Sequence, residues 1–97
     1  MSYKLKVKPS DEINTWLIFV DSQPVSGFNA NGDALLALAD GRHRLSYKIN
    51  GPGGSIELDI AEKPTIILPE GATWPITRKV PDGQTGATDA IYFRTGQ

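Results

Sequence analysis

The feature that most constrains the fold of this chain is a two-residue alternation of apolar and polar side chains, interrupted at short intervals by turn-forming residues. Tyr3, Leu5 and Val7 alternate with lysines, and residues 42–49 alternate in the same way. Successive side chains of a β-strand point to opposite faces, so this period indicates strands with one buried and one solvated face. The sequence therefore predicts an all-β protein.

Glycine, proline, asparagine and aspartate divide the chain into about seven or eight short strands. We expect strands at residues 3–8, 15–20, 34–39, 42–49, 56–60, 65–68, 74–80 and 89–95. Residues 34–39 contain alanine and leucine, which also favour a helix, but six residues are too few for a stable one.

Turn chemistry predicts how these strands are connected. Asp40-Gly41 and residues 50–54 are hairpin signals, so the central strands are expected to form a meander. Pro75 places its strand at a sheet edge or a bulge, and residues 81–87 are expected to form a mobile loop. Residues 1–97 are expected to form one small antiparallel β-sandwich domain.

Charge and composition limit the classes of partner. Ten basic and eleven acidic residues give a net charge of −1, which argues against nucleic acid and anionic lipid as partners. No apolar run is long enough for a membrane span, and the lysine-rich start lacks the apolar core of a signal peptide. The chain has no cysteine, so no disulfide supports the fold. We expect a cytoplasmic location.

Residues 16–60 resemble the PEGA-type β-sandwich domains. The likeness rests on residues 20–25, Val-Asp-Ser-Gln-Pro-Val, which end one strand, and on Gly41-Arg42-His43, which introduces the next. Two features depart from the family pattern: Ser22 stands where the family has glycine, and Pro69-Glu70-Gly71-Ala72 follows these strands instead of preceding them. The resemblance implies a PEGA-like or immunoglobulin-like sandwich associated with binding and assembly, and it implies no catalytic residue.

The sequence has no residue set with the spacing that catalysis or metal binding requires. His43 is the only histidine, and strand periodicity puts the nearby Ser46 on the opposite face, so we interpret His43 as a hydrogen-bonded structural residue. Asn29, Asn31 and Asp33 offer oxygens to a cation, but they lack the glycine position and the later glutamate of a calcium loop, which favours a turn. We expect no enzyme activity, metal or cofactor.

Apolar side chains that strand geometry leaves outside the core are the candidate binding residues. If Trp16, Ile18 and Val20 face the core, then Leu17 and Phe19 stand on the other face of the same strand. They lie either beneath another segment or at an interface, which predicts a module that binds a protein partner or forms a homodimer. The alternative is a carbohydrate-binding, lectin-like domain that uses Trp74 or Tyr92 as a stacking ring, and a small enzyme comes third.

Overall fold

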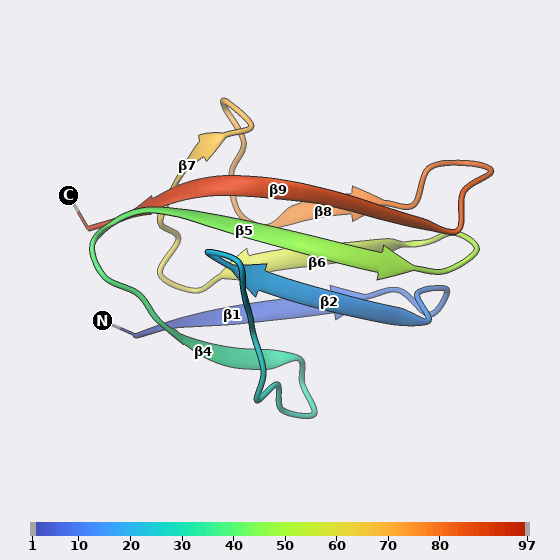
Figure 1. Cartoon of the computed structure of the whole chain (residues 1–97), viewed down its shortest axis with the longest axis horizontal. Helices are drawn as coiled ribbons and strands as arrows, with labels where there is room; N and C mark the ends of the chain where they lie inside the picture. The colour runs from blue at the N-terminus through green and yellow to red at the C-terminus, as the bar shows by residue number, and fades with distance from the viewer. Residues whose placement is uncertain (1, 97) are drawn as a thin grey trace.

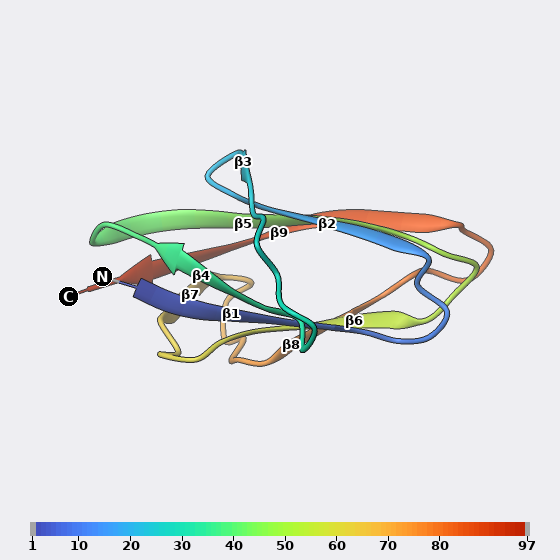
Figure 2. The same cartoon turned by 90° about the horizontal axis from the view of Figure 1, so that it is seen from below.

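The predicted strands pair into two antiparallel sheets in the computed structural model, which describes residues 2–96. The nine strands are β1 (Ser2–Pro9), β2 (Thr15–Val20), β3 (Gln23–Pro24), β4 (Asp33–Ala37), β5 (Gly41–Asn50), β6 (Ser55–Ile60), β7 (Thr65–Leu68), β8 (Ile76–Lys79) and β9 (Gly86–Thr95). The smaller sheet has the order β4-β1-β6-β8, and the larger sheet has the order β3-β2-β5-β9-β7. Figures 1 and 2 show the two layers. The predicted all-β sandwich is confirmed, and the short β3 is the strand that the sequence did not predict.

The core lies between the sheets and is built from the inward positions of both. Leu5, Leu45, Leu58 and Ile91 are fully buried, and they come from β1, β5, β6 and β9 respectively. Because the side chains alternate, the same strands expose lysines, arginines and carboxylates on their outer faces. Residues 2–96 contain no helix long and apolar enough to cross a membrane.

Residues 33–37 form a strand, as predicted, and the helix alternative is wrong. Ala34 and Leu36 are buried while Leu35 between them is exposed, which is the period of a strand. The strand begins after a turn in which Asn29 Oδ1 accepts hydrogen bonds from the backbone N–H groups of Asn31 and Asp33, at 2.9 and 3.0 Å. The amide oxygen of Asn29 is therefore already used to shape the turn.

Two predicted hairpins are wrong, and so is the predicted meander. At Asp40-Gly41 the chain passes from β4 in the smaller sheet to β5 in the larger sheet. At residues 51–54 it passes back to β6, as Figure 2 shows. A turn signal specifies that the chain reverses but does not say whether the next strand pairs with the last or faces it across the core. The true hairpin joins β2 to β3 at Asp21 and Ser22, whose φ angles of 52° and 68° suit a type I′ turn.

Gly51 fixes the crossing from β5 to β6 against the loop between β1 and β2. Its backbone N–H donates to Thr85 O at 2.9 Å, and a methyl group at this position would overlap the carbonyl oxygen of Glu12. The close approach of two backbones explains the need for glycine here. This end of the sandwich therefore holds β2, β5 and β9 in a fixed arrangement.

Candidate functional site

Leu17 and Phe19 lie on the outer face of the larger sheet, as the alternation along β2 predicts. Leu17 is 54% exposed and Phe19 is half-buried, whereas Ile18 and Val20 between and after them are buried in the core. Trp16 is half-buried, and its ring meets that of Phe28 edge-to-face with centroids 4.8 Å apart. More than half of the Leu17 side chain is therefore left to solvent, so it does not lie beneath another segment of the described chain.

Strand register brings residues from four strands together on this outer face. Leu17 on β2 lies in one row with Lys48 on β5 and Thr88 on β9, and the next row is Phe19, Ser46 and Ala90. Tyr92 on β9 pairs with Arg44 on β5 and with Leu68 on β7. The following row holds Arg42, Arg94 and Thr65. We call this surface the outer face of the larger sheet.

Small side chains in the middle of the outer face leave a shallow groove. Ser46 and Ala90 are half-buried and lie side by side in the register, with Phe19 beside Ser46. Arg44, Lys48 and Tyr92 rise around them, and the depression has a volume of about 530 Å³. The groove therefore combines an aromatic wall, two cations, a small polar floor and one carboxylate, Asp89, at its border.

The outer face carries positive charge that the overall net charge conceals. Arg42, Arg44, Lys48 and Arg94 are exposed at its outward positions, and among residues 2–96 none of them forms an ion pair. Asp89 borders the groove, but in the strand register it stands opposite Tyr47, whose side chain faces the core. Its Oδ1 accepts the backbone N–H of Ala90 at 2.8 Å.

The smaller sheet has a different charge pattern on its outer face. There, Lys6 stands opposite both Asp33 and Asp59, and Lys8 stands opposite Glu57. Opposite charges on neighbouring strands compensate each other. Lys4 and Lys79 stand opposite Leu35 and Ser55, so this compensation is partial, whereas on the larger sheet none of the four cations stands opposite a carboxylate in the paired register.

The two aromatic candidates, Trp74 and Tyr92, have different positions. Tyr92 is 37% exposed and joins the groove, whereas Trp74 is 9% exposed and belongs to the core. Trp74 Nε1–H donates to Pro64 O at 2.7 Å, and the ring packs edge-to-face on Phe93. The prediction of Trp74 as a binding ring is therefore corrected. β8, which follows Pro75, does lie at an edge of the smaller sheet, but the ring of Trp74 packs into the core.

Leu68 and Leu35 are exposed apolar residues that the sequence reasoning missed. Leu68 is 50% exposed beside Tyr92, because a bulge between Ile66 and Leu68 shifts the register by one residue. Strict alternation from the inward Ile66 would have buried Leu68, so no local signal identified it. Leu35 is 73% exposed on the other sheet, and its position was available from the alternation along residues 33–37.

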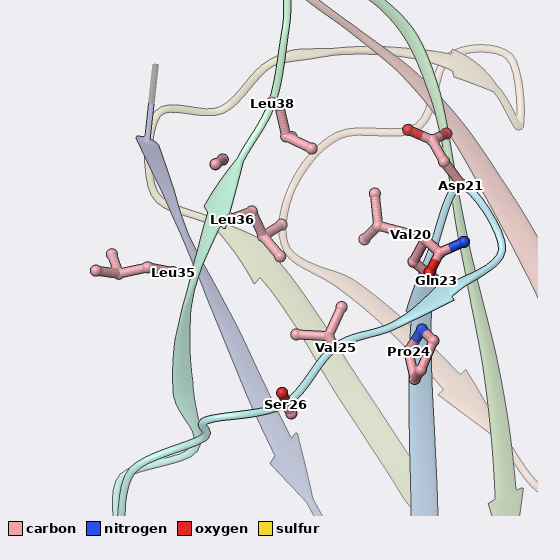
Figure 3. A pocket seen from close by; sticks show the side chains of 10 residues that line it. Val20, Asp21, Gln23, Pro24, Val25, Ser26, Leu35, Leu36 and Leu38 are labelled. Atoms are coloured by element: carbon pink, nitrogen blue, oxygen red, sulfur yellow. The ribbon is translucent and has the colours of Figure 1, made fainter.

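A second depression lies between the open edges of the two sheets (Figure 3). Val25 and Leu36 point toward each other across it, whereas Leu35 points away. Val7 N–H donates to Gly32 O at 2.9 Å, so in the alternating ladder the backbone groups of Ala34 and Leu36 face β1. Those of Leu35 and Ala37 then face the open edge, which pairs with no strand of the described chain.

His43 joins three parts of the chain at the start of β5. Its Nδ1 lies 2.6 Å from Asp21 Oδ2 and its Nε2 lies 2.7 Å from Ala39 O, so both nitrogens face acceptors. Asp21 Oδ1 also accepts the backbone N–H of Arg44 at 2.9 Å. An imidazole with two acceptors donates to both only when it is protonated.

The surroundings of His43 favour the charged ring. Burial opposes this by lowering the pKa of His43, but the hydrogen bonds to Asp21 and to Ala39 O, with the carboxylate charge, raise the pKa above its ordinary value of 6.5. Burial likewise raises the pKa of Asp21, while the bonds from His43 and from the Arg44 backbone lower it, and the net direction is down. Because both ring nitrogens are occupied, His43 is placed as a structural link and not as a free base.

Comparisons with protein-family models, with curated proteins and with solved structures find no match to this chain. The site is therefore interpreted from its own geometry. Within residues 2–96 no three histidine or acidic side chains are grouped as metal ligands.

Proposed function

We propose that this protein is a non-catalytic binding module that contacts another protein through the outer face of its larger sheet. The observation that carries the proposal is the exposure of Leu17, Leu68 and Tyr92 on one face of a sheet whose opposite face is buried; Tyr92 lines the groove, and the two leucines stand next to groove residues in the strand register. Large apolar side chains gathered on one face are typical of interaction sites, whereas single exposed ones need no explanation. Aromatic rings at the centre of such a face contribute most of the binding energy in known interfaces.

Two further observations support this proposal. Both nitrogens of His43 are engaged, so the ring lacks the free base position that a hydrolytic mechanism needs. The resemblance of residues 16–60 to PEGA-type domains, which are associated with binding, agrees with a non-catalytic role.

Selection of binders from a library of random peptides tests the proposal. Peptides selected on the wild-type chain should lose binding to the Leu17→Thr/Phe19→Thr variant, because threonine keeps the strand propensity and removes the apolar contact. Leu35→Thr provides the control, since it removes an exposed leucine from the other sheet. Selected peptides that bind wild type and the double variant equally would contradict the proposal.

The alternative of a carbohydrate-binding domain named Trp74 or Tyr92 as the stacking ring, and Trp74 is buried. It now rests on Tyr92 alone, with Ser46 and Thr88 as neighbouring polar groups. A glycan array that shows specific binding, abolished by Tyr92→Ala, would favour this alternative over protein binding.

A further inference from the structure

We propose that the partner segment bound by the outer face of the larger sheet is acidic, with carboxylates alternating along an extended chain and an apolar side chain among them. This inference rests on the proposed function and adds the chemistry of the partner. Three features support it: the charges of the face, the order of its side chains along β5, and the two other kinds of partner that the face disfavours.

Charge is the first argument. Arg42, Arg44 and Lys48 follow the central strand β5, and Arg94 stands opposite Arg42 on β9. No carboxylate among residues 2–96 forms an ion pair with any of the four. On the smaller sheet, by contrast, lysines stand opposite acidic residues. A partner that supplies carboxylates would bring to this face the opposite charges that Lys6 and Lys8 already meet in the strand register of the other face.

The order of side chains along β5 gives the pattern of the partner. The outward residues are Arg42, Arg44, Ser46 and Lys48, and alternate residues of a strand are about 6.8 Å apart. The groove lies over Ser46, between Arg44 and Lys48. An extended segment that lies along β5 would place its alternate side chains against the outward residues of this strand. Those over Arg42, Arg44 and Lys48 would meet cations, and the one over Ser46 would enter the groove. Phe19 and Tyr92 offer that one side chain an apolar wall.

The same face disfavours the other two candidate partners. A second copy docked by this face would bring two cationic faces together, which opposes association. Single-stranded nucleic acid binds to cationic faces by stacking its bases on exposed rings. Here Tyr92 is the one aromatic ring among residues 2–96 counted as exposed, and the other exposed apolar residues of the face, Leu17 and Leu68, are aliphatic.

Titration of the whole chain with synthetic probes tests the inference. The probes are a short peptide alternating glutamate with threonine around one central leucine, the same peptide with glutamine for glutamate, the same peptide with lysine for glutamate, and a single-stranded oligothymidine. The glutamate peptide should bind best, shift the amide signals of Ser46, Ala90 and Tyr92, and weaken as salt rises from about 50 to about 300 mM. Arg44→Ser/Lys48→Ser should weaken it about tenfold.

Lys6→Ser/Lys8→Ser is the matched control, because it removes the same charge from the outer face of the smaller sheet and should leave binding unchanged. Equal binding of the glutamate and glutamine peptides overturns the inference, as does tighter binding of oligothymidine, or no binding by any peptide. The two proposals fail separately. Peptides selected at random that need Leu17 and Phe19 but carry no acidic residues would leave the proposed function intact and refute its acidic partner.

Discussion

At the scale of single residues, His43 links the turn after β2 to the segment that enters β5. Asp21 and Ala39 O both accept from the ring, and Ala39 O also accepts from Thr95 Oγ1 at 2.7 Å. The ring is 10% exposed, while the Asp21 carboxylate is 47% exposed and partly screened by water. The imidazole therefore connects the turn after β2 to the segment before β5, and Thr95 of β9 joins this link at Ala39 O.

Stability should depend on pH through this link. The pKa of His43 is raised in the folded state, so its contribution is complete below the ordinary pKa of 6.5 and is lost as pH rises through the folded value. The melting temperature of wild type should fall from about pH 6 to about pH 9, by the equivalent of about 1 kcal/mol after allowance for screening. The variant His43→Gln does not titrate and should melt lower at pH 6 with a flat profile. Parallel profiles for both proteins would contradict the assigned link.

At the scale of elements, the edges of the two sheets are protected unequally. β3 carries Pro24, which has no N–H to offer a new strand. On β4 the loop before the strand satisfies an outward backbone group of Asp33 alone, because Asn29 N–H donates to Asp33 O. Leu35 and Ala37 still direct their backbone groups outward. An unprotected edge strand with an exposed leucine favours pairing between molecules.

Leu35→Lys should therefore slow aggregation on heating or long storage without loss of stability. The side chain is already in water, so the free energy of unfolding should change by no more than about 0.5 kcal/mol. Light scattering at a fixed temperature measures the aggregation rate, and denaturant unfolding measures the stability. Tyr92→Lys is the control on the other sheet, because its strand β9 is flanked by β5 and β7 and offers no free edge at this residue. An equal effect of both substitutions would show that general solubility, not the edge of β4, sets the rate.

At the scale of the whole molecule, the sequence predicted the strands but not how they pair. The apolar run at residues 15–20 and the alternation along residues 42–49 are local signals that predicted both strands, and strand geometry placed Leu17 and Phe19 outside the core. Asp40-Gly41 is a turn in either topology, so no local signal distinguished a hairpin from a crossing between sheets. The cluster of cations beside Tyr92 depends on the register of β5 with β9, which arises from tertiary packing. Leu68 joined the face only through a bulge.

The central claim is that Leu17 and Phe19 belong to the outer face of the larger sheet, where a partner can reach them, and not to the core. Denaturant unfolding of Leu17→Thr/Phe19→Thr tests it most directly, with Ile18→Thr/Val20→Thr on the opposite face of the same strand as the control. The first variant should lose no more than about 2 kcal/mol, because Leu17 is 54% exposed and Phe19 is only half-buried. The control should lose about 3 kcal/mol or more through lost burial and buried hydroxyls. Equal losses for the two variants would contradict the account.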